Sequence, residues 1–227
     1  MEQLEIEVKF HLPGVESMQR RIIELGAESK GRVFENNVRY EDESDSLIRK
    51  KSLLRLRRSD KTILTYKSSP PIANTEFKVF KELEVEVSDF ITMNQILDQL
   101  GFHPEQTYEK WRETLVLDRT WFYLDTMPYG TFLEIEGSEK DIRTYADRLA
   151  LGWHKRILLN YLEIFEIIRQ ELGLKFTDLT FKNFNDIKIN LAAFIDRLEA
   201  GSSSSTNKDR GQKTEDREEL PDDREHT

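Results

Sequence analysis

Hydrophobic and polar residues alternate strictly near the start of the chain, in LEIEVKF at residues 4–10. In a β-strand, this spacing places Glu5, Glu7 and Lys9 on one face and the apolar side chains on the other. The same alternation returns in LEVEVSDF at residues 83–90 and in LEIEGSEK at residues 133–140. The pattern therefore predicts three strands, each with one apolar face and one face of ionised groups.

Each of these strands is followed by a helical segment and then by a glycine. In the helical segments, apolar residues stand three and four positions apart, as in Val15, Met18, Ile22 and Leu25, and again in Phe90, Met93, Leu97 and Leu100. This spacing predicts one apolar face per helix. We expect Gly26, Gly101 and Gly152 to end these helices in the left-handed conformation. The chain thus repeats a unit of strand, helix and stop.

Four further segments alternate in the same way and predict strands, at residues 53–58, 62–68, 110–117 and 120–126. Only Asp118 and Arg119 separate the last two, which predicts a hairpin. The polar faces of all these strands collect charge, at Arg55, Arg57, Thr65, Lys67, Lys78, Glu82, Glu84, Glu86, Lys110, Arg112, Asp125, Glu134 and Glu136. For any single strand, a solvated outer face is the simplest interpretation.

The predicted helices favour a different interpretation for the strands taken together. An apolar face on every strand must be covered, and the chain offers at least three amphipathic helices to cover it from outside. If the apolar faces lined the inside of a sandwich or barrel, these helices would have no surface to pack on. We therefore expect an α+β fold in which a closed antiparallel β-barrel encloses the charged faces and the helices pack on its apolar exterior.

Such a charged interior requires a ligand with both signs of charge, because like charges held together repel and burial penalises each one. Carboxylates without cysteine favour a hard divalent cation, Mg²⁺ or Mn²⁺. The four histidines, His11, His103, His154 and His226, show no paired metal-ligand spacing. Converging Arg and Lys side chains favour a polyanion with phosphate oxygens. A metal-chelated polyphosphate satisfies both requirements.

Composition narrows the class of protein further. The chain has 227 residues, a formal net charge of -9 and no cysteine, which fits one domain with a tail in the reducing cytoplasm. No apolar run approaches the roughly 18 residues that span a bilayer, and the first residues do not resemble a signal peptide. The acidic balance argues against nucleic acid as a partner. We also expect a loop at residues 68–74, SSPPIAN, and a disordered polar tail at residues 201–227.

The order of the charged motifs resembles a known family. The E-x-E-x-K of Glu5, Glu7 and Lys9 is followed by LLRLRR, LTYK, KELEVE, YEKWRETLVL and LDTMPYGTFLEIEG, all within residues 1–165. The first motif alone is weak, but the whole series resembles the CYTH domain family, also called the triphosphate tunnel metalloenzymes. The resemblance implies an eight-stranded antiparallel tunnel that holds a triphosphate and one or two Mg²⁺ or Mn²⁺ ions. Members include thiamine triphosphatases, inorganic triphosphatases, RNA triphosphatases and class IV adenylyl cyclases.

The resemblance also implies roles for individual residues. The implied metal ligands are Glu5, Glu7, Asp125, Glu134 and Glu136, and the implied triphosphate contacts are Lys9, Arg55, Arg57, Lys67, Lys78, Lys110 and Arg112. Glu82 and Glu84 match the middle E-x-E, and they would either bind a second metal or neutralise neighbouring bases. Phe80 stands where the family has a second basic residue. Its ring would narrow the cavity or offer a flat surface to a base or thiazole ring.

The same groups support two reactions, in which a metal withdraws charge from phosphorus while Arg and Lys stabilise the charged oxygens. In hydrolysis, our first expectation, water attacks the terminal phosphorus of inorganic triphosphate, thiamine triphosphate or ATP, with Glu5, Glu7 and Lys9 as catalytic residues. In cyclisation, a ribose hydroxyl attacks the phosphorus nearest the sugar, and ATP becomes cyclic AMP and pyrophosphate. The third alternative is a module that binds polyphosphate without turnover.

Residues beyond the resemblance predict a cover for the barrel. Apolar residues at helical spacing predict helical segments within residues 157–200, and Tyr161 resembles a family tyrosine that closes the end of the barrel. We expect a tunnel domain at 1–165, a helical extension at 166–200 and the tail at 201–227. The last helix would pack on the barrel or form a homodimer. Trp111, Trp121 and Trp153 are expected in the core or as cover residues, with Trp111 facing outward under a helix.

Overall fold

Eight strands form the body of the protein in a computed structural model, which describes residues 4–70 and 74–200. Residues 71–73 of the predicted loop and the predicted tail at 201–227 lie outside the described residues. The strands are β1 (Leu4–Leu12), β2 (Glu28–Asp42), β3 (Ser52–Arg58), β4 (Thr62–Ser68), β5 (Lys78–Val87), β6 (Phe102–Leu117), β7 (Thr120–Met127) and β8 (Gly130–Glu136). The strands predicted from alternation are all present.

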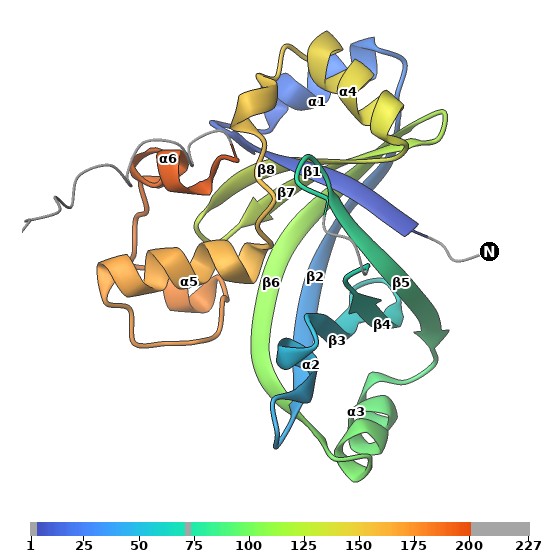
Figure 1. Ribbon diagram of the computed structural model, residues 1–227, viewed down its shortest axis with the longest axis vertical. Coiled ribbons are helices and arrows are strands. Elements are labelled where there is room, and N and C mark those ends of the chain that lie inside the picture. The colour runs from blue at the N-terminus through green and yellow to red at the C-terminus, as the bar shows by residue number, and fades with distance from the viewer. Residues whose placement is uncertain (1–3, 71–73, 201–227) are drawn as a thin grey trace, which may run out of the picture.

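The strands close into a barrel in the order β1-β5-β4-β3-β2-β6-β7-β8, with every neighbouring pair antiparallel. β1 completes the ring because it pairs with β5 on one side, where Glu7 lies opposite Lys78, and with β8 on the other, where Lys9 lies opposite Glu134. Figure 1 shows the helices on the outside of this ring. The predicted α+β fold with an antiparallel closed barrel is confirmed.

The repeated unit of strand and helix is also confirmed. β1 leads to α1 (Glu16–Glu24), β5 to α3 (Phe90–Gln99) and β8 to α4 (Glu139–Arg148). Gly26 and Gly101 follow the first two helices with φ of 102° and 87°, the left-handed conformation that glycine adopts without strain. The prediction for Gly152 was wrong, because its φ is -64° and Ala150 takes the left-handed conformation instead, with φ of 48°.

Three apolar clusters lie between the barrel exterior and the helices. The first packs α1 and α4 on β1, β7 and β8, with Ile22 and Ile142 both fully buried, and Figure 1 shows these two helices side by side. The second lies under α5 (Tyr161–Leu172), and the third lies between α3, α2 (Ser46–Arg49), β2 and β3. The strands therefore turn apolar residues outward, and burial of these residues under helices stabilises the inverted barrel.

The helices do not cover the whole apolar exterior of the barrel. On β5, the outward Leu83 and Val85 are 59% and 54% exposed. Trp111 of β6 faces outward, as its alternation with Lys110 predicts, but it is 39% exposed and packs against Phe34 rather than under a helix. The prediction that a helix covers Trp111 was therefore wrong.

β2 is the strand that alternation did not predict. It pairs with β6 along almost its whole length, and the partners run from Glu28 opposite Val116 to Asp42 opposite Phe102. As a result, β6 begins at Phe102, eight residues before the predicted strand at 110–117. The first apolar residue that faces outward from β2 is Phe34, the seventh residue of the strand, so the short alternation gave a weak signal.

The C-terminal region is less helical than predicted. α5 begins with a capping box between Asn160 and Glu163 and ends at Gly173. After it, the described chain contains only the short turns η2 (Lys182–Phe184) and η3 (Leu191–Ala193) and the four-residue α6 (Ile195–Leu198). Leu179 pairs with Tyr108 of β6, so part of this segment lies along the barrel as extended chain. The expected helical segments are therefore present at α5 and near residues 191–198, with mostly non-helical chain between them, and their apolar residues pack on the barrel. In the described part of the chain, every helix is too short or too polar to span a bilayer.

Candidate active site

The barrel encloses a lumen, and alternation brings the predicted site residues to its wall. Six of these charged side chains are buried, with Asp125 fully buried and Lys9 only 1% exposed. The buried charged set is Glu7, Lys9, Glu35, Glu41, Arg55, Lys110, Asp125 and Glu134. Burial of so many ionised groups is costly unless each has a partner. Their partners therefore define the electrostatics of the site.

One cluster joins β1, β6, β7 and β8. Lys9 Nζ lies 2.6 Å from Glu134 Oε1, and Lys110 Nζ lies 3.1 Å from Asp125 Oδ2. Arg112 donates through Nε and Nη2 to both oxygens of Asp125, at 2.7 and 2.6 Å, and Nη2 also contacts Glu134. Strand register explains these pairs, because Lys9 lies opposite Glu134 and Arg112 opposite Asp125. Burial would raise the pKa of Glu134, but Lys9 and Arg112 hold it well below its usual range.

Tyr161, the first residue of α5, covers this cluster. Its hydroxyl donates to Asp125 Oδ2 at 2.8 Å. The ammonium groups of Lys9 and Lys110 lie 4.4 and 5.4 Å from the centre of its ring. Burial and the neighbouring carboxylates, Asp125 and Glu134, raise the pKa of Tyr161 well above its usual range, so the phenol stays protonated. We call this Tyr161-covered end of the lumen the deep end.

A second cluster lies between β2, β3, β4 and β6. Arg55 donates to the hydroxyls of Tyr108 and Thr65 at 3.1 and 3.2 Å. Arg57 donates to Glu35 at 3.4 Å, and Lys110 lies 3.5 Å from the same carboxylate. Burial would raise the pKa of Glu35, but Lys110, Arg112, Arg57 and Arg55 outweigh it and lower the pKa to about 2.

Sequence reasoning missed the lumen residues of β2. Glu35 and Asn37 are 3% and 0% exposed, and the buried Oδ1 of Asn37 has no hydrogen-bond partner. Glu35 and Asn37 stand two residues apart in ENN at residues 35–37. This segment has no E-x-E motif and no long apolar run beside it, so there was little reason to predict a strand there. The structure brings Glu35 among the predicted triphosphate contacts, where it balances part of their charge.

A third cluster, on β1, β4 and β5, is more acidic. Lys67 pairs with Glu5 at 2.5 Å and with Glu82 at 3.1 Å, and Lys78 pairs with Glu7 at 3.2 Å. Burial raises the pKa of Glu82 to about 7, with the carboxylates of Glu5 and Glu84 adding to it and Lys67 opposing it. Glu84 lies further out and accepts hydrogen bonds from Thr65 at 2.7 Å and Arg57 at 3.1 Å.

Glu136 extends this acidic wall onto β8. It lies directly opposite Glu7 in the β1–β8 pairing. Burial, followed by the carboxylates of Glu5 and Glu7, raises the pKa of Glu136 to about 7. Negative charge therefore exceeds positive charge around Glu5, Glu7 and Glu136, which is the environment that a divalent cation would relieve.

The predicted metal ligands have suitable chemistry but are not gathered into a coordination shell. Across residues 4–70 and 74–200, no group of three or more acidic or imidazole side chains is close enough to hold a metal ion. The carboxylates instead pair with bases, as Asp125 does with Arg112 and Glu134 with Lys9. Oxygen donors with excess negative charge fit Mg²⁺ or Mn²⁺. These side chains would have to leave their basic partners to bind it.

Phe80 lies on the lumen side of β5, opposite Glu5. The ammonium groups of Lys78 and Lys67 lie 5.1 and 5.9 Å from the centre of its ring. A cation held over an aromatic face is attracted by the negative charge of that face. The ring is therefore engaged with two lysines.

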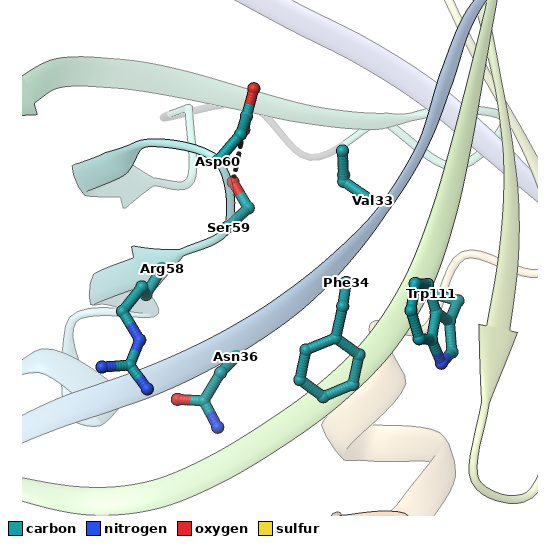
Figure 2. A pocket seen from close by; sticks show the side chains of 7 residues that line it. All are labelled: Val33, Phe34, Asn36, Arg58, Ser59, Asp60 and Trp111. Carbon is teal, nitrogen blue, oxygen red and sulfur yellow. Dashed lines mark hydrogen bonds between the residues drawn. The ribbon is translucent and has the colours of Figure 1, made fainter.

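A separate pocket of about 450 Å³ lies beside the β3–β4 turn. Figure 2 shows Phe34 and Trp111 next to each other on one side of β2 and β6, with Ser59 and Asp60 across from them. Its remaining lining residues are Val33, Asn36 and Arg58. None of these seven residues was predicted as part of the site. The predicted site lies in the lumen, among the ion pairs described above.

Comparison with known proteins identifies the family. The model of the CYTH domain matches residues 3–161. The PH1012 protein of Pyrococcus horikoshii OT3 is 30% identical, and the match covers 69% of this chain and 96% of that protein with a TM-score of 0.60. The search of curated proteins gave no significant match.

Two more distant structures share the fold. A candidate adenylate cyclase from Vibrio parahaemolyticus is 18% identical, with a TM-score of 0.63 over 73% of this chain and 99% of that protein. HpAC1 from Hippeastrum, a candidate adenylyl cyclase described as having a dominant triphosphatase activity, is 18% identical, with a TM-score of 0.50 over 74% of this chain and 96% of that protein. Because the matched family model covers all eight strands of the barrel and the residues that line it, this chain belongs to the CYTH domain family.

Proposed function

We propose that this protein is a divalent-metal-dependent triphosphatase that binds a triphosphate in the lumen and hydrolyses its terminal phosphoanhydride. One observation supports this most strongly: the basic side chains of Lys9, Arg55 and Lys110 are buried inside the barrel, and that of Arg112 beside them is only 13% exposed. Carboxylates and hydroxyls are their polar partners. A polyanion with phosphate oxygens is the ligand that suits converging Arg and Lys groups.

The acidic wall suits the metal. Glu5, Glu7 and Glu136 would hold Mg²⁺ or Mn²⁺, joined by Asp125 and Glu134 as their basic partners turn to phosphate. When bound, such an ion supplies a Lewis acid that withdraws charge from phosphorus and lowers the pKa of water. Glu82 and Glu84 neutralise neighbouring bases, because Glu82 pairs with Lys67 and Glu84 with Arg57. This favours the second of the two roles that the sequence left open for them.

Binding of the triphosphate exchanges one set of ionic contacts for another. Lys9 and Arg112 would leave Glu134 and Asp125 and donate to phosphate oxygens, so the ion pairs of the free protein keep these groups charged and aligned before substrate arrives. Tyr161 holds Asp125 in place through its hydrogen bond. Arg55 is positioned by the hydroxyls of Tyr108 and Thr65, and its Nη2 also lies 3.5 Å from Glu84 Oε1.

In the reaction, the oxygen of a water molecule bonds to the terminal phosphorus, and the bond from that phosphorus to the bridging oxygen breaks. The leaving group is a diphosphate, the other product is orthophosphate, and a lumen carboxylate accepts the proton of the water. Lys9, Lys110 and Arg112 stabilise the negative charge that grows on the equatorial and leaving oxygens. Positioning and electrostatics supply most of the catalysis, as in other phosphoryl transfers.

Cyclisation of ATP is the second candidate, because LDTMPYGTFLEIEG and the pair of Lys110 and Arg112 are also typical of the cyclase branch of the family. One assay separates the candidates. Purified protein with Mg²⁺ or Mn²⁺ is incubated with inorganic triphosphate, thiamine triphosphate or ATP, and orthophosphate, pyrophosphate and cyclic AMP are measured. Orthophosphate from any of the three supports the proposal. Cyclic AMP with pyrophosphate would replace it with the cyclase, and binding without any product would leave the binding module.

A further inference from the structure

A stack of side chains leads from the deep end of the lumen to solvent. Arg112, held by both oxygens of Asp125, lies with its guanidinium carbon 4.0 Å from the centre of the Tyr123 ring. Tyr123 in turn stacks on Trp121, with ring centres 6.4 Å apart and planes 17° apart. Asp125, Tyr123 and Trp121 stand at every second position of β7, so all three belong to its lumen face. The stack ends at Trp121, which is 41% exposed.

Trp121 lies at the end of the barrel opposite Tyr161. It stands at the start of β7, directly opposite Glu136 at the end of β8. Because neighbouring strands are antiparallel, β1 begins and β5 ends at the rim where β8 ends. Glu84, near the end of β5, has a side chain that is 40% exposed. Exposure thus rises from Asp125 at the deep end to Glu84 and Trp121 at this rim. We call this rim the mouth of the lumen.

The other aromatic rings near the lumen are already engaged. Phe80 has two ammonium groups against it, and so does Tyr161. Trp111 is as exposed as Trp121, but it lies on the outer face of the barrel beside Phe34 (Figure 2). Among the described residues, Trp121 is therefore the aromatic side chain that lies on the lumen face, at the mouth, and still presents much of its surface to solvent.

We propose that Trp121 is a stacking platform that binds the planar aromatic ring of an organic triphosphate, and that it makes this protein prefer such substrates to inorganic triphosphate. This inference rests on the proposed function. Phosphates held by Lys9, Lys110 and Arg112 at the deep end leave the organic end of the substrate at the mouth. A ring stacked on the indole there extends the series of Arg112, Tyr123 and Trp121 by one member. A nucleobase and a thiazolium ring share this flat shape.

The test compares Trp121→Ala with two controls. Trp121→Phe keeps an aromatic platform, and Trp111→Ala removes a tryptophan of similar exposure from the outer face. For each variant, kcat/KM is measured with ATP, thiamine triphosphate and inorganic triphosphate. Stacking of one ring on an aromatic side chain is lost on substitution by alanine, and we expect Trp121→Ala to lower kcat/KM about 10-fold for an organic substrate. We expect a change of less than about twofold for inorganic triphosphate and for both controls, since these retain the platform or never formed it.

Comparison of the three substrates identifies which kind of ring stacks on Trp121. A loss confined to ATP supports a nucleobase, and a loss confined to thiamine triphosphate supports a thiazolium ring. An equal loss for all three substrates, or no loss for either organic one, overturns the inference.

A binding measurement separates this inference from the proposed hydrolysis. In EDTA, ATP or thiamine triphosphate is titrated while tryptophan fluorescence is recorded for the wild type and for Trp121→Phe. Quenching by the organic ligand that is present in the wild type, absent in Trp121→Phe and absent with inorganic triphosphate supports the platform even if no product forms. Hydrolysis of inorganic triphosphate without such quenching overturns the platform and leaves the triphosphatase intact.

Discussion

Glu35→Gln tests whether the lumen carboxylates hold the basic groups in place. Glu35 is 3% exposed and contacts Arg57 at 3.4 Å and Lys110 at 3.5 Å. The substitution keeps the shape of the side chain but removes its charge, so that Lys110, Arg57 and Arg55 remain buried with less compensation. Removal of one partner from a buried ion pair is strongly destabilising.

The magnitude follows from the pKa of Glu35, which falls from 4.5 to about 2 on folding. A shift of this size corresponds to about 3 kcal/mol of folding stability at pH 7. Because the folded pKa is the lower one, this stability is fully present above pH 4.5 and is lost as the pH falls toward 2. The difference between the wild type and Glu35→Gln should therefore be about 3 kcal/mol at pH 7 and roughly half of that near pH 3.

Urea unfolding at pH 7 and pH 3 measures this difference as a free energy of unfolding. Glu28→Gln on the same strand is the control, because Glu28 is 74% exposed and pairs with Lys30 on the surface. We expect this control to change stability by less than about 0.5 kcal/mol. Inorganic triphosphate should stabilise Glu35→Gln more than the wild type, because the released cations are free to bind it. A variant as stable as the wild type at pH 7, or a loss that does not shrink with acidity, would refute this reasoning.

Three further predictions concern the lumen. Glu134→Gln should lower kcat for triphosphate hydrolysis at least about 100-fold, since charge at this position orients Lys9 and Arg112; full activity would refute the assignment. Chelation of divalent ions by EDTA should abolish orthophosphate release, and Mg²⁺ or Mn²⁺ should restore it; turnover that persists in EDTA would exclude a metal-dependent reaction. Glu82→Gln should be more stable than the wild type at pH 8 by about 1 kcal/mol or more. The pKa of Glu82 is raised to about 7 in the folded protein, so the wild type loses stability progressively as the pH rises from 4.5 to 7. If urea unfolding gave the same difference in stability between the variant and the wild type at pH 5 and at pH 8, this prediction would be contradicted.

The sequence predicts seven of the eight strands and the direction of their faces, because E-x-E and R-x-R patterns report side-chain orientation directly. It did not contain the partners of each charge. Lys9 meets Glu134 because the β1–β8 register places them opposite each other, and no local pattern fixes the register of strands that are more than 100 residues apart in the chain.

β2 shows where pattern reasoning fails. Its first residues are exposed on both faces, and its lumen residues include the uncharged Asn37, so neither an apolar run nor a charged motif marked it. It is nevertheless held along its length by the ladder to β6. Pattern reasoning also fell short at Trp121. The sequence TWFYLDT shows that Trp121 shares a strand face with Asp125, but only the closed barrel places Trp121 at the mouth of the lumen.

A crystal structure of the protein with inorganic triphosphate and Mn²⁺, recorded with anomalous scattering, tests the central claim most directly. The account predicts a triphosphate inside the barrel in contact with Lys9, Lys110 and Arg112, and an anomalous peak beside Glu5, Glu7 and Glu136. A triphosphate bound on the outer surface, with the pairs of Lys9 with Glu134 and Arg112 with Asp125 still formed and no anomalous peak in the lumen, would contradict it.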